Sequence, residues 1–328
     1  MCPELFKIPF TSLTVKSYGL MLVIGFIAAI YIIGRLSRYI GHNPDQIKTA
    51  ALYAMISGLA GARIFYVIHY WADFRNDPVT ALYIWQGGLE LLGGVFAGAA
   101  VMIVYMKIHK LPIRRYLDIL AIGLMIALAF GRIGCFLNGC CYGKPADVAW
   151  SVRFPYGSIP YKSQSFKDLS RGRTKPYFTL PDTFFLHYFD RSGTDRVFLK
   201  PANKLSDTDK QYLRDKDLMR SLAVHPTQLY SSLNAFVIFV ILYFFWKRTI
   251  KAQSGQIKYL GVYNPGVTFS LMFAMYGPGR FVLEAFRDGN PYEVAHLTIS
   301  QLLGMGLFVV GIAGIVIFSR LKPPASPR

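Results

Sequence analysis

The chain has 328 residues, of which 53% are hydrophobic and 16% are charged, and its formal net charge is +18. Soluble domains usually carry about 25% charged residues, so the composition argues against an ordinary soluble protein. A large positive charge can indicate nucleic-acid binding, but here the Lys and Arg residues lie in alternate loops between apolar runs. We therefore expect no nucleic-acid partner.

Seven apolar runs are each long enough to cross about 30 Å of hydrocarbon as a helix of about 20 residues. They cover residues 17–36, 49–71, 88–106, 116–137, 226–246, 266–286 and 297–318. The first run is too long for a signal peptide and no small-residue cleavage site follows it, so we expect a retained first helix. The sequence thus predicts an all-α integral membrane protein with seven transmembrane helices.

The distribution of basic residues predicts the orientation of these helices. One set of helix ends carries 14 Lys and Arg residues, whereas the short segments at the opposite ends carry four. Basic loops stay in the cytoplasm, which places the N-terminus outside and the C-terminus in the cytoplasm. An odd number of helices agrees with termini on opposite sides.

Residues 143–222 form the one long polar segment, inserted between the fourth and fifth spans of a single membrane domain covering residues 1–328. We expect a small extracytoplasmic head; a partly disordered loop is the alternative. Its aromatic pieces (Tyr177–Leu180, Phe184–Phe189 and Val197–Leu199) are candidates for short strands or an interfacial helix. Asp207–Arg220 has the composition of a polar helix.

The segment Gly131–Pro145 begins inside an apolar run and ends in a Gly-rich turn. Arg132 lies in the apolar part, where insertion of an arginine costs about 2.5–3.5 kcal/mol, so such a residue is usually paired or functional. Asn138 and free backbone N–H groups follow within ten residues. This combination suits the binding of an anionic headgroup near a membrane surface.

Three of the four cysteines, Cys135, Cys140 and Cys141, lie close together in this segment. Cys140 and Cys141 are adjacent and poorly placed for a disulfide with each other. A zinc site usually needs a second cysteine pair or histidines, and no second pair is close in sequence. The sequence favours small buried hydrophobic side chains, with metal binding as the alternative, and we expect no metal and no cofactor.

A second charged cluster lies at the end of the sixth run, where Arg280 and Glu284 are four residues apart and Tyr276 is one turn earlier. These spacings place all three on one helix face. Pro278 can bend the helix there. Either Arg280 and Glu284 form an ion pair that only satisfies itself, or Glu284 holds Arg280 for a phosphate group.

A third candidate site, His225–Tyr230, opens the fifth run. Thr227 and Gln228 are placed to cap or line the start of the helix, an end that favours anions. His225 is either a site residue or a cap or surface residue. The predicted topology brings Arg132, Arg280 and these polar residues to the same extracytoplasmic side.

Over nearly its whole length the chain resembles the prolipoprotein diacylglyceryl transferases of bacterial plasma membranes. The resemblance rests on several motifs, of which the arginine signature followed by Asn138-Gly139 is the most specific. They are Tyr18-Gly19-Leu20-Met21, Gly61-Ala62-Arg63, the paired glycines at 87–94, Gly131-Arg132-Ile133-Gly134 with Phe136 and Asn138-Gly139, His225–Tyr230, Arg280 with Glu284, and Ser300-Gln301.

The resemblance implies transfer of the diacylglyceryl group from phosphatidylglycerol to the lipobox cysteine of a prolipoprotein signal peptide, with glycerol phosphate leaving. It implies a multi-pass protein of the bacterial inner membrane with its active site facing the extracytoplasmic leaflet. Arg132 and Arg280 would clamp the phosphate and Glu284 would orient Arg280. Further site residues that it implies are Tyr276, Tyr18, Asn138, Gly143, His225, Gln228 and Cys140.

Three positions depart from the family pattern. Leu92 stands where the family has a histidine thought to act as the base, and Cys135 and Cys140 stand where it usually has Asn and Glu. If the reaction is retained, the base is left open among Glu284, His225, a cysteine thiolate and solvent. Two other functions stay open: a diverged lipid-group transferase with another acceptor, and a non-catalytic phospholipid-binding or transport protein.

Overall fold

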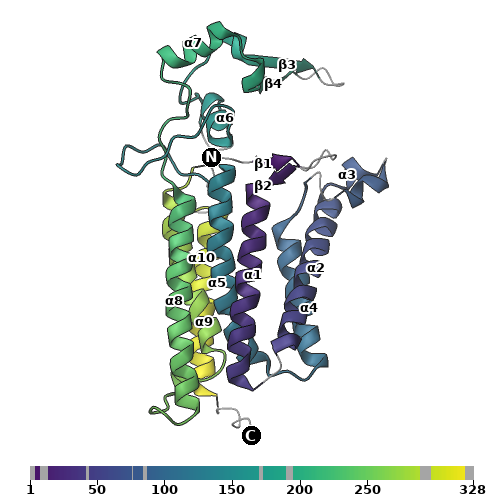
Figure 1. The fold of residues 1–328 in the computed structure, drawn as a ribbon, viewed down its shortest axis with the longest axis vertical. Helices are drawn as coiled ribbons and strands as arrows, with labels where there is room; N and C mark the ends of the chain where they lie inside the picture. Colours follow the sequence, from purple (N-terminus) through teal and green to yellow (C-terminus); the bar gives the residue numbers. More distant parts are fainter. Residues whose placement is uncertain are drawn as a thin grey trace. The chain divides into compact units, whose positions relative to one another are not determined.

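The computed structural model describes residues 4–7, 14–41, 44–75, 77–83, 87–169, 173–189, 195–288 and 297–321, most of them in helices (Figure 1). The long helices are α1 (Ser17–Ser37), α2 (Pro44–His69), α4 (Leu91–Ile108), α5 (Ile113–Asn138), α8 (Thr227–Gln253), α9 (Val267–Ala285) and α10 (Ile299–Arg320). The short helices are α3 (Trp71–Phe74), α6 (Ile159–Ser165) and α7 (Asp207–Asp215), with 3₁₀ turns at Arg38–Ile40, Pro78–Leu82, Asp182–Phe184, Ala202–Lys204 and Gly261–Tyr263. Two antiparallel strand pairs complete the described elements: β1 (Glu4–Lys7) with β2 (Thr14–Lys16), and β3 (Phe185–Phe189) with β4 (Asp195–Leu199).

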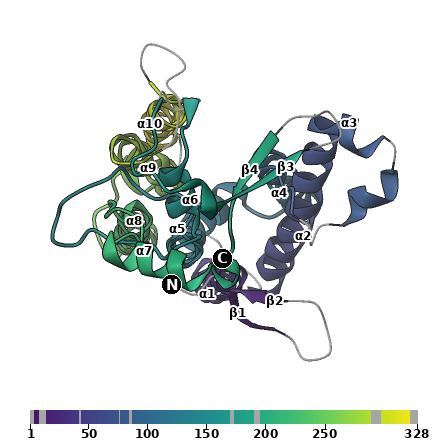
Figure 2. The ribbon, with the colours of Figure 1, turned by 90° about the horizontal axis from the view of Figure 1, so that it is seen from above.

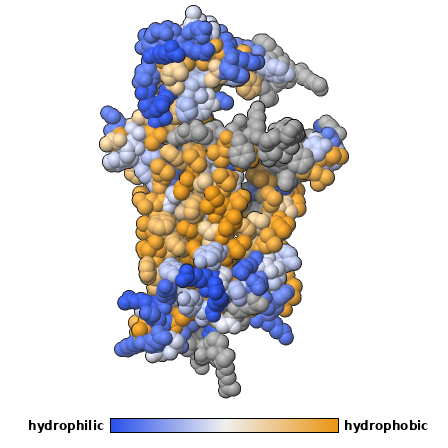
Figure 3. All heavy atoms as spheres, viewed as in Figure 1, coloured by the Kyte–Doolittle hydropathy of each residue, from blue (hydrophilic) through white to orange (hydrophobic). Residues whose placement is uncertain are grey.

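A helix occupies each of the seven predicted apolar ranges. Within the described residues, five of these helices (α1, α2, α5, α8 and α10) are long and apolar enough to cross a membrane. The apolar part of α4 is shorter, and α9 carries Pro278, Arg280 and Glu284. The surface over the long helices is largely hydrophobic in Figure 3, and hydrophilic side chains gather beyond the helix ends. The all-helical, multi-pass membrane fold is confirmed, whereas the number of seven spans stays a prediction.

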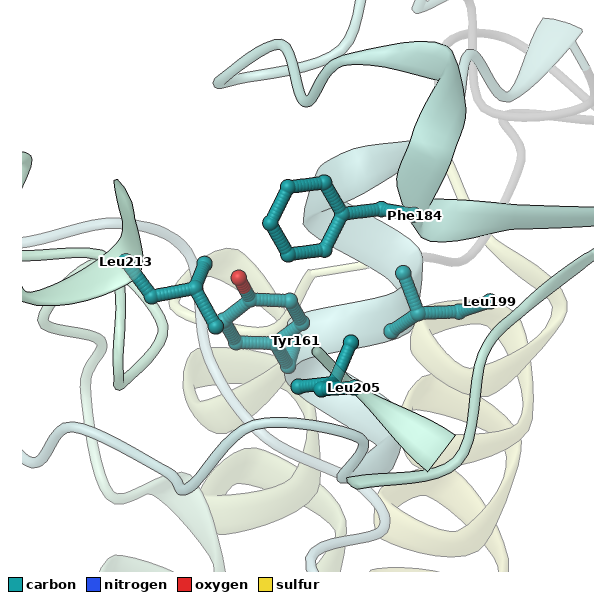
Figure 4. Close-up of a cluster of buried hydrophobic side chains, with 5 residues drawn as sticks. All are labelled: Tyr161, Phe184, Leu199, Leu205 and Leu213. Atoms are coloured by element: carbon teal, nitrogen blue, oxygen red, sulfur yellow. The ribbon is translucent and has the colours of Figure 1, made fainter. Parts of the chain in front are cut away.

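The polar segment 143–222 has its own hydrophobic core in its described part. Tyr161 of α6, Leu213 of α7 and three further side chains are buried together (Figure 4); the three are Phe184, Leu199 and Leu205. Strands form at Phe185–Phe189 and Asp195–Leu199, in agreement with two of the predicted pieces, while Tyr177–Leu180 is not a strand. A shared core of aromatic and leucine side chains gives this segment a reason to fold rather than remain a loop.

The polar helix predicted over Asp207–Arg220 forms but is shorter, because α7 ends at Asp215. Its start has a reciprocal capping box, in which the Ser206 hydroxyl accepts from the Asp209 N–H and the Asp209 carboxylate accepts from the Ser206 N–H. Beyond its end, Asp217 has a φ of 54°, which a helix cannot continue through.

The chain divides into two compact units that each contain parts of several helices. One comprises residues 1–26, 125–240 and 273–312, and the other residues 27–124, 241–272 and 313–328. In the first unit, a Cβ on Gly277 of α9 would lie 2.4 Å from the Gly304 carbonyl oxygen of α10, so the two backbones touch. The Ser232 hydroxyl of α8 donates to the Ala129 carbonyl of α5 at 2.9 Å. Small residues thus let these helices pack closely side by side (Figures 1 and 2).

In the second unit, α2 packs against α4 through glycines. A Cβ on Gly61 would lie 2.3 Å from the Ala97 Cβ and 2.7 Å from the Gly93 carbonyl oxygen. Gly58 and Gly94 face each other one turn away, where a Cβ on Gly58 would lie 3.3 Å from the Gly94 carbonyl oxygen. Small residues on both helices thus let α2 and α4 pack closely.

Gly61→Ala is expected to destabilise the folded protein by about 1–3 kcal/mol, the usual cost of an added methyl group in a filled contact. Gly306→Ala in α10 is the matched control, because no atom lies within 4 Å of its added Cβ. Thermal unfolding in detergent should show a lower midpoint for Gly61→Ala and no decrease for Gly306→Ala. Equal midpoints for the two variants would contradict the contact.

The start of α9 is fixed by a buried carboxylate that the sequence analysis did not single out. Asp118 of α5 is 2% exposed and accepts the backbone N–H groups of Gly266 and Phe269, both at 2.8 Å. Gly266 directly precedes α9 and Phe269 lies in its first turn, where backbone N–H groups have no partner within the helix. Asp118 therefore serves as a helix cap supplied by a neighbouring helix.

Asp118→Ala is expected to lower the free energy of unfolding by about 1–3 kcal/mol or more, because it leaves two buried N–H donors without an acceptor. Asp45→Ala is the control, since Asp45 is a largely exposed carboxylate that pairs with Lys48 at the surface. Unfolding in mixed micelles compares the two variants. A loss of stability no larger for Asp118→Ala than for Asp45→Ala would show that the cap contributes little.

Candidate functional site

The site is built in the first unit, where α9 presents Arg280. Its Nη1 lies 2.8 Å from Oε2 of Glu284, and its Nη2 donates to the Ser300 hydroxyl of α10 at 2.7 Å. Glu284 is 4% exposed and also faces Arg287, whose Nη1 lies 3.7 Å from the same oxygen. The predicted ion pair between positions 280 and 284 is confirmed. Two fixed partners hold the Arg280 guanidinium in one orientation.

Arg132 of α5 joins the same cluster. It is half-buried, forms a hydrogen bond with the Tyr276 hydroxyl of α9, and interacts electrostatically with Arg280. Glu284 is the carboxylate that contacts Arg280 and Arg287. Three guanidinium groups around one carboxylate leave the cluster with excess positive charge, which favours an anion.

The turn after Arg132 is a Schellman motif, the helix stop in which a left-handed residue follows the last helical turn. Gly139 has a φ of 78°, its N–H donates to the Phe136 carbonyl at 3.2 Å, and the Cys140 N–H donates to the Cys135 carbonyl at 3.1 Å. Asn138 is the last residue of α5 and forms a side-chain hydrogen bond with Cys140. The Asn138-Gly139 signature therefore ends the helix and turns the chain back over Cys135.

Residues at the start of α8 hold this turn in place. The Thr227 hydroxyl donates to the Cys141 carbonyl and the Gln228 amide donates to the Cys140 carbonyl, both at 2.8 Å. Both side chains thus bond the cysteine turn, and their part in a binding site stays a prediction. Cys141 has a φ of 59°, which is uncommon for a residue with a side chain, and the two hydrogen bonds help to maintain it.

Gly143 has a packing reason for being glycine. A Cβ there would lie 2.6 Å from both the Cβ and the carbonyl oxygen of His225, and 2.8 Å from the Phe286 carbonyl oxygen. The backbone beside it is bonded on both sides, because Gly143 donates to the His225 carbonyl and Lys144 donates to the Phe286 carbonyl. Residues 143–144 thus link the chain just before α8 to the chain just after α9.

His225 lies beside this junction and contacts aromatic side chains. Its Nδ1 is 3.2 Å from the Tyr230 hydroxyl, and its ring lies edge-to-face on Phe286 at 5.3 Å between centroids. The Trp150 indole N–H also reaches the Tyr230 hydroxyl, at 2.6 Å. His225 is therefore held in place by its neighbours, which leaves its role in the reaction a prediction.

Tyr18, in the first turn of α1, packs against α5. A Cβ on Gly134 would lie 3.2 Å from Cδ2 of the Tyr18 ring, so the glycine makes room for the ring. Tyr18 interacts electrostatically with Arg132 and with the nearby cysteines. The structure therefore brings Tyr18, Arg132, Tyr276, Arg280 and the cysteine turn together.

Leu92 and the paired glycines at 87–94 belong to the second unit. Leu92 lies in α4 and its side chain is 57% exposed. Arg63 is 8% exposed, and its guanidinium donates to four backbone carbonyls at 2.7–2.9 Å: those of Thr80, Ala81, Gly87 and Gly88. Arg63 thus shapes the loop before α4. Trp85 and Gln86, which precede these glycines in the sequence, lie outside the described residues.

Three residues near the site were not predicted: Arg287, Arg173 and Asp288. Arg287 lies three residues after Glu284, a spacing that indicates the same helix face. The ion pair between Arg173 and Asp288, at 3.6 Å with both side chains about one-tenth exposed, ties the polar segment to the chain after α9. No spacing rule could have found this pair, because 115 residues separate its members.

Comparison with known proteins identifies the family of the chain. A family model described as prolipoprotein diacylglyceryl transferase matches residues 3–317. A Clostridium tetani protein named phosphatidylglycerol–prolipoprotein diacylglyceryl transferase is 26% identical over 314 residues, covering 95% of this chain and 96% of its own. A protein of the same name from Stenotrophomonas maltophilia is 28% identical over 320 residues, covering 95% and 90%. The chain belongs to the prolipoprotein diacylglyceryl transferase family.

Proposed function

We propose that this protein transfers the diacylglyceryl group of phosphatidylglycerol to the lipobox cysteine of prolipoproteins, releasing glycerol phosphate. The observation that carries the proposal is the cluster of Arg132, Tyr276 and Arg280, with excess positive charge at the end of apolar helices. A phospholipid presents a single anionic phosphate next to apolar chains, which is the shape of this site. The names of the family relatives supply the reaction.

In this proposal Arg132 and Arg280 stabilise the leaving group. As the bond between the glycerol carbon and the phosphate oxygen breaks, negative charge grows on that oxygen, and pre-positioned guanidinium groups stabilise it. Each charge-assisted hydrogen bond contributes about 1.5–3 kcal/mol. Arg280 is held for this role by Glu284 and Ser300, and Arg132 by Tyr276.

The acceptor must react as a thiolate. A free thiol has a pKa of about 8.5, so only a few per cent is ionised at neutral pH. The positive cluster favours the thiolate of an approaching cysteine. Tyr18, Asn138, Gly143, His225, Gln228 and Cys140 complete the proposed binding site.

We also propose the finer topology. All seven long helices cross the membrane, including α4 and α9, with the N-terminus outside and the C-terminus in the cytoplasm. Residues 143–222 form an extracytoplasmic head, and the site faces the outer leaflet of the bacterial inner membrane. Support comes from the basic residues that gather at one set of helix ends.

The direct test is transfer in vitro. Purified protein is mixed with phosphatidylglycerol and a lipobox peptide, with a Cys→Ser peptide as control, and the products are analysed by mass spectrometry. Thioether-linked lipid that depends on the cysteine is expected. Absence of product, with an active family member run in parallel, would reject this reaction and favour a diverged transferase with another acceptor.

A further inference from the structure

The three neighbouring cysteines converge in space. The Sγ atoms of Cys135, Cys140 and Cys141 all lie within 4.8 Å of one another. All three are free thiols; Cys135 is 8% exposed and the other two are half-buried. A shared metal ion needs at least three His, Cys, Asp or Glu side chains with their ligand atoms close together. Among the residues that the structure describes, these three cysteines form such a group.

The fold explains this convergence. A Schellman motif brings the residue two positions after the helix cap back over the residue three positions before it, here Cys140 over Cys135. The left-handed backbone of Cys141 then returns its side chain to the same place, and Thr227 and Gln228 hold both carbonyls. A left-handed cysteine costs free energy that glycine would avoid, and such a strained residue is a candidate for a functional role.

The separations match a zinc site. Zn–S bonds of about 2.3 Å in a tetrahedron place the sulfur atoms about 3.8 Å apart, within the range found here. Three protein ligands with an open fourth position are typical of catalytic zinc, whereas structural zinc has four. The sequence argument against a metal was the lack of a second cysteine pair; the structure supplies Cys141 as the third ligand instead.

Positively charged groups lie beside the three cysteines. Arg132 interacts electrostatically with Cys135 and Cys141, and Arg287 interacts with Cys141. Three thiolates exceed the charge of Zn²⁺, and these guanidinium groups offset the excess. The cluster therefore lies directly beside the arginine that we assign to the lipid phosphate.

We propose that Cys135, Cys140 and Cys141 bind a zinc ion whose open position receives the acceptor cysteine as a thiolate. That the acceptor is the lipobox cysteine of a prolipoprotein rests on the proposed function. Zinc in this position replaces the base that Leu92 cannot supply, because coordination deprotonates a thiol outright.

The step balances without a redox change. The acceptor thiol gives its proton to water as its sulfur binds Zn²⁺. A sulfur electron pair then forms the S–C bond to the glycerol carbon, the C–O bond to the phosphate breaks, and its electron pair leaves on glycerol phosphate. The thioether product is a weak zinc ligand and dissociates, which frees the position for the next thiol.

Metal binding is tested first, independently of activity. Full-length protein in detergent is stripped with a chelator and titrated with Zn²⁺, and separately with Co²⁺, whose thiolate charge-transfer absorption reports sulfur ligands. One metal ion per chain is expected, with loss of binding in Cys135→Ser and Cys141→Ser but not in Cys2→Ser. No charge-transfer band in the wild-type protein would overturn the site, whatever the variants do.

The acceptor is tested next on the Co²⁺-loaded protein. A lipobox peptide is expected to increase the charge-transfer absorption by adding a fourth thiolate, and a Cys→Ser peptide should leave it unchanged. In the transfer assay, chelation should lower the rate by about 10²-fold or more, the usual contribution of a proton-removing group, and Zn²⁺ should restore it.

The outcomes separate the two proposals. Full transfer by metal-free protein would overturn the zinc while leaving the transferase function intact. A peptide thiol that joins the bound metal, with no transfer from phosphatidylglycerol, would support the thiol-binding zinc and reject this lipid donor. A bound metal whose spectrum ignores the peptide thiol would overturn the activating role.

Discussion

Arg132→Ala is expected to lower the rate of diacylglyceryl transfer by about 10²–10³-fold, the usual loss when one group that stabilises a developing negative charge is removed. Arg132 lies beside Tyr276 and interacts with Arg280, so its removal leaves the proposed phosphate site with half of its clamp. Arg132→Lys should recover only part of the rate, because an ammonium group keeps the charge but loses the planar fork of donors. Initial rates with phosphatidylglycerol and a lipobox peptide measure both variants.

The matched control is Arg35→Ala, at an exposed position in the last turn of α1. It removes the same side chain and the same charge from an end of a long helix without touching the cluster. The two variants should have similar unfolding midpoints, and only Arg132→Ala should show a large loss of transfer rate. A wild-type rate in Arg132→Ala would reject the clamp.

Most of the fold could be predicted from hydrophobicity and helical spacing. Each apolar run became a helix because a chain in hydrocarbon must satisfy its backbone groups internally, as α10 does over Ile299–Arg320. The pair Arg280 and Glu284 was predictable for a similar reason, since a four-residue spacing fixes neighbours on a helix. Both inferences use only local geometry.

The site's remaining contacts depend on tertiary structure. Thr227 is 86 residues from the Cys141 carbonyl that it bonds, and the Asp118 carboxylate is 148 residues from Gly266. Periodicity cannot report such pairs, because it describes one element at a time. The need for a glycine at position 143 likewise appears only in the folded chain, where His225 and Phe286 pack against it.

Two of the departures from the family pattern are separate in the sequence but belong together in the structure. In the sequence, Cys135 and Cys140 are two separate losses of polar residues, alongside the loss of a histidine at Leu92. In the structure they form one cluster with Cys141, beside Arg132. Asn138-Gly139 was a signal that could have indicated this, because a glycine stop that closes a Schellman motif brings Cys140 back to Cys135.

Glu284→Gln is expected to lower the free energy of unfolding by about 3–5 kcal/mol, the cost of removing one partner of a buried ion pair. Glu284 is 4% exposed and lies between Arg280 and Arg287, so the neutral amide leaves crowded guanidinium groups without a counter-charge. Transfer should also fall, because Arg280 loses the partner that orients it. Unfolding in mixed micelles and the transfer rate are measured on the same preparations.

The double variant Arg280→Gln/Glu284→Gln separates the two interpretations of this pair. Removing both charges is expected to restore much of the stability lost in Glu284→Gln, because neither partner is then left buried alone. Transfer should stay low if Arg280 acts on the phosphate. A double variant that recovers both stability and transfer would show that the ion pair only satisfies itself, and Arg132 would then have to carry the phosphate without it.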